Sequence, residues 1–324
     1  MSLVIENFST SGSNPDARSA VIRTLLYFNI FNHPLTEKEI FNLLQQKEIV
    51  ESGIESALES LIHDGIIQFH QGYYFLNNTS NIIQRRIDGE SNAAKSFAIA
   101  KKYSKLIAKF PFVRSIALSG SLSKKFMDSK SDIDYFIITA PGRMWIARTL
   151  LVLYKKLFLF NSHKYFCVNY FLTENALEVP DKNIFTATEI SFLIPTYNYE
   201  IYRNFREANE WSDDYLPNFP LRQKEFLIDE KKNGLKKVLE KIMSGYIGEK
   251  LDEYYFRLTL KFWKKKFKHF DDSTFDFRLR SRKNVSKHHP LGYQEKVLTS
   301  YSENITSFTR AHHISLHAED PVYA

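Results

Sequence analysis

Residues 117–138, "ALSGSLSKKFMDSKSDIDYFII", place the strongest constraint on the fold of this chain. An apolar run ends at Gly120-Ser121, and a second one begins around two aspartates, Asp132 and Asp134, that alternate with apolar residues. Side chains two apart on a strand point to the same face, so the pattern predicts a buried strand with both carboxylates on one side.

Two carboxylates this close repel each other unless both are solvated, one is protonated or a cation lies between them, and paired hard oxygen ligands suit Mg²⁺. The simplest alternative is a strand end that emerges into water. Gly120-Ser121 argues against it, because a glycine at a strand end lets backbone N–H groups approach a phosphate and a serine adds a hydroxyl donor. Phosphate donors beside a carboxylate-held metal predict a nucleoside triphosphate site.

"LSGS" and "SDIDYFII" resemble the signature of the nucleotidyltransferase superfamily, which has the DNA polymerase beta-like fold. The resemblance implies that Asp132 and Asp134 are the catalytic, Mg²⁺-binding residues, and that Gly120 and Ser121 bind the nucleotide phosphates. It also makes Lys124 and Lys125 candidate nucleotide-binding residues. Many minimal members carry a second glycine where this chain has Lys125, which either reaches phosphate or is a solvated helix position.

The resemblance also implies a third carboxylate on a later strand. The expected strand is "KYFCVNYFLT", residues 164–173, and it carries Cys167 and Asn169 where an aspartate would be expected. Neither is acidic, and an asparagine is neither a general base nor a source of negative charge for a second Mg²⁺. Glu174 and Glu178 lie just beyond the strand and are alternative third acids. If the strand lies beside the aspartates, Cys167 and Asn169 should share the face that points toward them.

The predicted fold class is a multidomain α+β protein. Residues 1–16 are expected to be a flexible tail, 17–80 a winged helix-turn-helix, 81–180 a nucleotidyltransferase-like core with a mixed β-sheet and helices, and 181–324 a helical C-terminal part. In the N-terminal part, Thr36 and Glu39 form a capping-box pattern, and "IIQFHQGYYFL" alternates into a hairpin that turns near Gln71-Gly72.

The predicted third helix carries glutamates at positions 51, 55 and 59 on one face, and no Lys or Arg lies between Glu51 and Phe69. Such a helix should repel a DNA duplex, because neutralising phosphates supplies most nonspecific affinity for DNA. The sequence therefore favours a domain that contacts a protein partner or a second copy of the chain over a DNA reader.

The most apolar long run, "MWIARTLLVLYKKLFLF", contains three cations and predicts a buried amphipathic helix, so no membrane association is expected. The start of the chain has no signal-peptide pattern, and the single cysteine fits a reducing cytoplasm. Residues 222–310 carry 21 Lys/Arg against 12 Asp/Glu, so this basic part could hold nucleic acid or a phosphorylated substrate. Its aromatic residues Phe262, Trp263 and Phe267 are expected in the core, and the adjacent histidines 288–289 and 312–313 are expected at the surface.

These observations leave three hypotheses open. In the first, the chain binds NTP-Mg²⁺ and transfers a nucleoside monophosphate to an unknown acceptor hydroxyl. In the second, it is a nucleotide-binding regulator or pseudoenzyme that lacks the third acid and contacts a partner through its N-terminal domain. The third and least favoured is a DNA-binding regulator.

Overall fold

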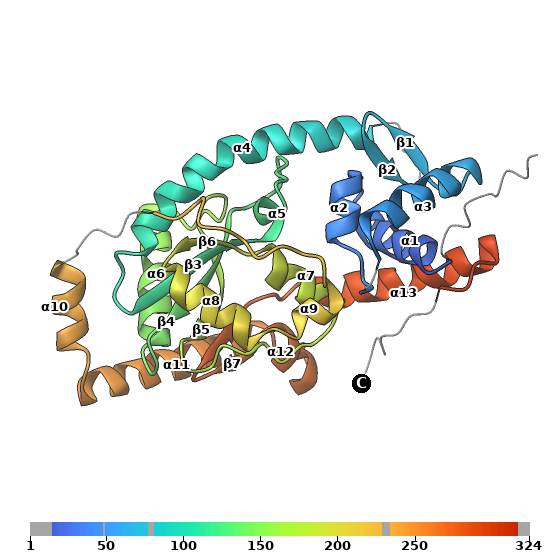
Figure 1. Cartoon of the computed structure of the whole chain (residues 1–324). Helices are drawn as coiled ribbons and strands as arrows, with labels where there is room; N and C mark the ends of the chain where they lie inside the picture. The colour runs from blue at the N-terminus through green and yellow to red at the C-terminus, as the bar shows by residue number, and fades with distance from the viewer. Residues whose placement is uncertain (1–14, 48, 77–80, 229–233, 317–324) are drawn as a thin grey trace, which may run out of the picture. The chain divides into compact units, whose positions relative to one another are not determined.

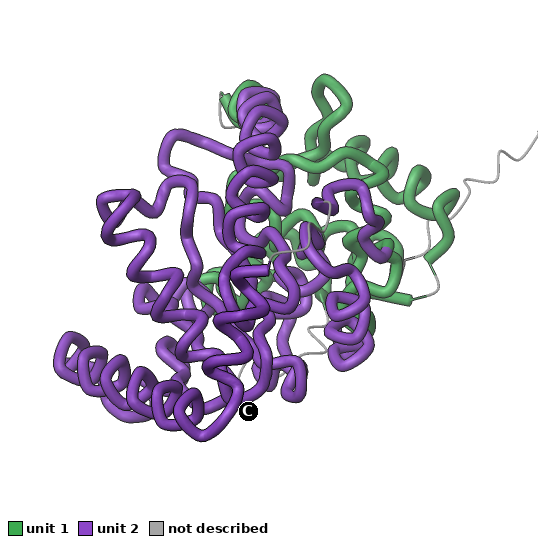
Figure 2. Tube along the Cα trace, turned by 90° about the vertical axis from the view of Figure 1, so that its left-hand side faces the viewer, with its two compact units in different colours: residues 1–85, 213–220, 297–324 green, residues 86–212, 221–296 purple. Residues whose placement is uncertain are grey.

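The computed structural model describes residues 15–47, 49–76, 81–228 and 234–316, so most of the predicted tail lies outside the described residues. The protein is α+β, with a mixed open sheet and several helices, as expected (Figure 1). It divides into two compact units (Figure 2). Unit 1 contains residues 1–85, 213–220 and 297–324, and unit 2 contains residues 86–212 and 221–296.

Unit 1 begins with three helices and a two-stranded hairpin, where the sequence predicts them: α1 Pro15–Asn29, α2 Glu37–Asn42, α3 Glu51–His63, β1 Gln68–His70 and β2 Tyr73–Phe75. Thr36 and Glu39 form the predicted capping box at the start of α2. The hairpin turns at Gln71-Gly72, where both residues have positive φ.

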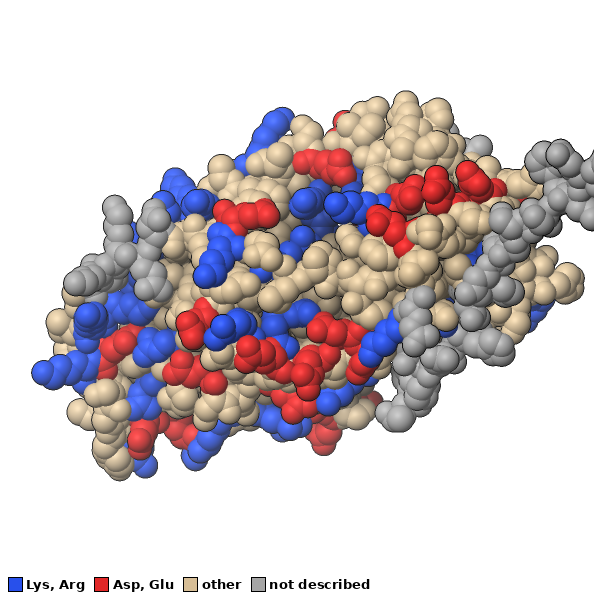
Figure 3. Space-filling model, in the orientation of Figure 1, with Lys and Arg blue, Asp and Glu red and all other residues tan. Residues whose placement is uncertain are grey.

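The exposed face of α3 is acidic. Glu51, Glu55 and Glu59 are all exposed, whereas Ile54 and Leu58 on the opposite side are buried. On the face of the molecule seen in Figure 3, acidic and basic side chains are interspersed. The acidic face of α3 is the one that the sequence predicted.

Unit 1 also contains elements from distant parts of the chain, namely most of α9 (Ser212–Tyr215) and most of α13 (Tyr293–His312). Tyr301 of α13 donates a hydrogen bond to Gln45 over 2.8 Å, and its ring lies edge-on to that of Tyr27 at 5.3 Å. The last helix therefore packs on the N-terminal helices, which the sequence did not indicate.

The six-stranded sheet of unit 2 has the order β6-β3-β4-β5-β8-β7. Its strands are β3 Val113–Ser119, β4 Asp134–Thr139, β5 Cys167–Thr173, β6 Ile194–Tyr197, β7 Ser281–Arg282 and β8 Val285–Lys287. All neighbours are antiparallel except β4 and β5, which are parallel. Beyond residue 180 we expected helices, but this part also supplies the three short strands β6, β7 and β8. β6 pairs with β3, β8 pairs with β5, and β7 pairs with β8 at the edge of the sheet.

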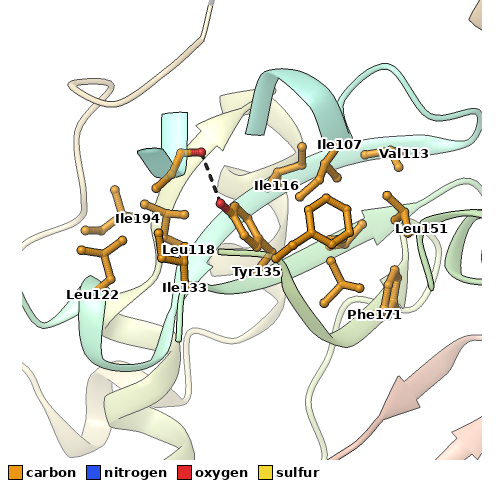
Figure 4. Close-up of a cluster of buried hydrophobic side chains, with 14 of the residues drawn as sticks. Ile107, Val113, Ile116, Leu118, Leu122, Ile133, Tyr135, Leu151, Phe171 and Ile194 are labelled. Carbon is orange, nitrogen blue, oxygen red and sulfur yellow. Dashed lines mark hydrogen bonds between the residues drawn. The ribbon is translucent and has the colours of Figure 1, made fainter. Parts of the chain in front are cut away.

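Helices cover both faces of the sheet. One face packs against α4 (Ile82–Ile107) and α6 (Met144–Phe158), and Tyr135 is buried in this core, with its hydroxyl near the Ala100 carbonyl (Figure 4). The other face carries Phe136 and packs against α7 (Ile184–Phe192) and α8 (Tyr199–Ala208). Asp134 is two residues from Phe136, so alternation directs it toward the α7 side.

The other helices of unit 2 are α5 Gly120–Ser123, α10 Gly234–Ile242, α11 Tyr246–Lys266 and α12 Asp272–Arg278. α6 is the amphipathic helix that the sequence predicted, and α11 packs against it. Within the described residues, no helix combines the length and the apolar character needed to cross a membrane.

Candidate functional site

The turn after β3 lies directly against the Asp134 carboxylate. Gly120 has a φ of +64°, a conformation that favours glycine, and a Cβ at this position would lie 2.3 Å from Oδ2 of Asp134. Ser119 of β3 pairs with Asp134 of β4, which explains the proximity. Only glycine fits this position without displacing the carboxylate, and Ser121 follows it in the first turn of α5.

Asp134 is the first residue of β4, and Asp132 precedes the strand. The observed strand therefore begins later than the sequence predicted, although Ile133 already forms backbone hydrogen bonds with Lys164 and Cys167. Burial, and to a smaller extent the negative charges of Asp132 and Glu189, raise the pKa of Asp134 from 3.8 to about 6. Burial is the largest cause, and the hydrogen bond from Cys167 and the positive charge of Lys124 offset only part of it.

Asn169 lies beside Asp134, as predicted. Its side-chain amide donates a hydrogen bond to Oδ1 of Asp134 over 2.9 Å. Cys167 pairs with Asp134, and the register of β4 and β5 then shifts by one residue, so Asn169 occupies a β-bulge. Burial and the neighbouring Asp134 raise the pKa of the Cys167 thiol, so the thiol stays protonated. Both side chains at the predicted third-acid position are therefore neutral.

Glu189 is an acidic residue near this site that the sequence analysis did not identify. It lies on α7, and its carboxylate accepts a hydrogen bond from Nζ of Lys124 over 2.8 Å. Lys124 Nζ is also 3.3 Å from the Gly120 carbonyl oxygen. Lys124, predicted to bind phosphate, is therefore held at the Gly-Ser turn by a carboxylate. No local pattern distinguishes Glu189 from an ordinary helix-surface glutamate.

Lys125 is exposed and has a φ of +56°. This left-handed conformation is unfavourable for a residue with a Cβ and is readily adopted by glycine. Lys125 thus carries backbone strain at the position where the resembled family often has glycine. Its side chain points to solvent, whereas that of Lys124 contacts the turn.

Glu174 and Glu178 do not complete the site. Glu174 follows the C-terminal end of β5 and bonds through its backbone N–H to Thr139, the last residue of β4. Asp134 is at the opposite end of the same two parallel strands. Glu178 forms an ion pair with Lys182 over 2.9 Å. Glu174 therefore lies at the wrong end of the strands to act beside Asp134, and Glu178 pairs with a neighbouring lysine instead.

The donor set at this site fits a single hard cation better than two. Asp132 and Asp134 would supply carboxylate oxygens, and Asn169 would supply a carbonyl oxygen if its amide turned over. The described residues contain no group of three or more His, Cys, Asp or Glu side chains arranged to hold a metal ion. Glu189 interacts electrostatically with Asp134 but is paired with Lys124.

Two expectations about the basic C-terminal part need correction. His288 and His289 are partly buried rather than exposed, because the segment after β8 folds back beside Asn169 and brings the His288 ring to 4.7 Å from the Trp263 ring. Of the aromatic residues expected in the core, Trp263 and Phe267 are buried but Phe262 is exposed.

A cavity of about 360 Å³ opens elsewhere in unit 2, lined by residues of α8 and of the segment 224–228. None of its lining residues belongs to the Gly-Ser turn, β4 or β5. Comparison with known proteins gives no match to a family model, to a curated protein or to a solved structure.

Proposed function

We propose that the chain binds a nucleoside triphosphate together with Mg²⁺ at the Gly-Ser turn and the two aspartates. Gly120 and Ser121 contact the phosphates, Lys124 adds a positive charge, and Asp132 and Asp134 hold the metal ion. When bound, Mg²⁺ offsets the negative charge of the phosphates and of Asp134.

One observation carries this proposal: the absence of a side chain at Gly120 brings the backbone of the turn against the Asp134 carboxylate. A phosphate bound to the turn would therefore lie within reach of a cation held by Asp134. The raised pKa of Asp134 supports the same assignment, since a buried carboxylate gains more from a nearby cation than a solvated carboxylate does.

The reaction proposed for this site is nucleotidyl transfer. An acceptor hydroxyl attacks the α-phosphorus, a new oxygen–phosphorus bond forms, the bond from that phosphorus to the bridging oxygen breaks, and pyrophosphate leaves while the hydroxyl proton passes to water. Positioning and charge neutralisation carry such a reaction. The acceptor is unknown.

A second candidate function is nucleotide-dependent regulation with little or no transfer. Asn169 favours it, because a neutral amide lies at the predicted third-acid position and occupies one oxygen of Asp134. In this case unit 1 contacts a protein partner or a second copy of the chain in response to nucleotide. The exposed acidic face of α3 weighs against duplex DNA as the partner of unit 1. The cytoplasm, inferred from the single cysteine, is the proposed location.

Pyrophosphate release separates the two functions. Each of the four common ribonucleoside triphosphates is incubated with Mg²⁺ and the protein, with and without candidate acceptors such as sugar alcohols, protein and RNA ends. Release that depends on Asp134, tested with Asp134→Asn, supports transfer. Binding of a triphosphate without release by the wild type, together with release by Asn169→Asp, supports the regulatory function. Absence of Mg²⁺-dependent triphosphate binding would contradict both.

A further inference from the structure

Helix α6 carries a buried arginine that has no acidic partner. Arg148 is 9% exposed, and its guanidinium lies over the rings of Trp263 and Trp145, 4.6 and 5.5 Å from their centroids. No carboxylate of the described residues forms an ion pair with it. Burial lowers the pKa of Arg148 to about 10, so it remains a cation at neutral pH.

Lys155 lies two helical turns after Arg148 on the same face of α6 and is 6% exposed. Its Nζ is 3.3 Å from both ring nitrogens of His163, and no described carboxylate is within ion-pair distance. A neutral imidazole accepts through only one nitrogen, so most of the donor capacity of this ammonium is unused. Burial, and then the positive charge of Arg148, lower the pKa of Lys155.

Neutral histidines and a further lysine surround the two buried cations. His288 lies against Trp263, the ring on which Arg148 also stacks. Burial and nearby cations lower the pKa of His288 to about 3, and burial and Lys155 lower the pKa of His163, so both imidazoles favour the neutral form at pH 7. The exposed Lys266 interacts electrostatically with both histidines.

The positive charge of this cluster exceeds its negative charge. Arg148, Lys155 and Lys266 are cationic, and the acidic group that interacts with Lys155 and His163 is Asp132. Burying a cation without a partner is unfavourable, so buried charges are normally paired. Stacking on tryptophan offsets part of this unfavourable burial for Arg148, but no aromatic ring among the described residues lies beneath Lys155. The structure keeps an excess of positive charge that an anion would compensate.

We propose that Lys155, Arg148, His163 and His288 form a binding site for the phosphate group of a phosphorylated ligand. Three cations against one carboxylate complement a dianion, which favours a phosphate monoester over a diester. His163 is exposed and gives the ligand access from solvent, while the two neutral imidazoles can donate to phosphate oxygens. Asp132 interacts with this cluster and is also a proposed Mg²⁺ ligand, but binding of phosphate here requires neither Mg²⁺ nor a triphosphate, so the two proposals can be tested separately.

The test measures binding of inorganic phosphate, glucose 6-phosphate and dimethyl phosphate by calorimetry, without divalent cations and at constant ionic strength set with chloride. We expect inorganic phosphate and glucose 6-phosphate to bind and the monoanionic dimethyl phosphate to bind at least about tenfold more weakly. If only inorganic phosphate binds, the site takes free phosphate. If none of the three binds the wild type, the proposal is overturned.

The variants locate the binding. Lys155→Met should weaken phosphate binding at least about tenfold, and Lys155→Arg should retain it. Lys156→Met is the matched control, because Lys156 is the next residue on the same helix but is exposed. The dissociation constant of this variant for phosphate should differ from that of the wild type by less than about twofold. Phosphate binding is measured without divalent cations, which separates this site from the proposed Mg²⁺-dependent triphosphate site. Equal affinities for Lys155→Met and Lys156→Met would refute the assignment.

A measurement on the wild type covers the case in which Lys155→Met does not fold. The ring signals of His163 and His288, followed by NMR during a phosphate titration, should shift in a saturable way. If they do not shift while phosphate binds, the anion lies elsewhere and the proposal fails.

Discussion

Asp134 is predicted to destabilise the folded protein at neutral pH when no cation is bound. Its pKa is raised from 3.8 to about 6, chiefly by burial. The folded state therefore holds the proton more tightly than the unfolded state does. Between these two values the folded protein is protonated at Asp134 and the unfolded chain is not, so the free energy of unfolding falls as the pH rises through this window.

The magnitude follows from the size of the shift. About two pKa units at ~1.4 kcal/mol each amount to at most about 3 kcal/mol of lost stability above pH 6. About 1.4 kcal/mol of that loss develops between about pH 5 and pH 7. Asp134→Asn removes the titration and keeps an oxygen that accepts from Asn169. The variant should therefore be more stable than the wild type at pH 7, by a margin that shrinks toward pH 5.

Urea denaturation across this pH range measures the free energy of unfolding of the variant and of the wild type. In the difference between the two, the contributions of most other titrating groups cancel. If Asp134→Asn shows the same stability difference at pH 5 and pH 7, or is less stable than the wild type at pH 7, the reasoning about its burial is wrong.

Three further substitutions test the geometry of the site. Gly120→Ala should lower the free energy of unfolding by at least about 1 kcal/mol more than the control Gly142→Ala. Both glycines have a φ of +64°, but only at Gly120 does the new Cβ meet Asp134. Equal losses of stability in chemical denaturation would contradict this contact. Lys125→Gly should raise the free energy of unfolding by about 0.5 kcal/mol, because glycine adopts the left-handed backbone conformation without strain. A loss of stability would show that the Lys125 side chain contributes more than the strain costs. Asn169→Asp should destabilise the metal-free protein at pH 7 and tighten Mg²⁺ binding in a titration, and unchanged Mg²⁺ affinity would place the cation away from Asn169.

The core of the candidate site could be predicted from the sequence because its signals are local. Alternation over residues 117–138 identified β3 and β4, glycine marked the turn, and the two-residue period placed Cys167 and Asn169 on the side of Asp134. The β-bulge at Asn169 was not predictable, since it arises from the pairing of β5 with β4 and leaves no mark on the composition of either strand.

The remaining features depend on contacts between residues far apart in the chain. Glu189 reaches the site because α7 packs on the sheet face that carries Asp134, and a glutamate in "FTATEISF" has no pattern of its own. Strands β6, β7 and β8 have two to four residues each, too few for a periodic signal. His288 is partly buried because the segment after β8 runs beside β5 and α11, which adjacency to another histidine does not reveal.

Stabilisation by nucleotide tests the central claim most directly. Thermal unfolding is measured with each common nucleoside triphosphate, with and without Mg²⁺, for the wild type and for the double variant Asp132→Asn/Asp134→Asn, and each shift is taken from that protein's own ligand-free midpoint. A ligand that binds only the folded state raises the midpoint. We predict that at least one triphosphate stabilises the wild type only when Mg²⁺ is present and has no such effect on the double variant. Equal shifts in the two proteins, or no Mg²⁺-dependent shift with any triphosphate, would contradict the assignment of Asp132 and Asp134 to a metal-dependent nucleotide site.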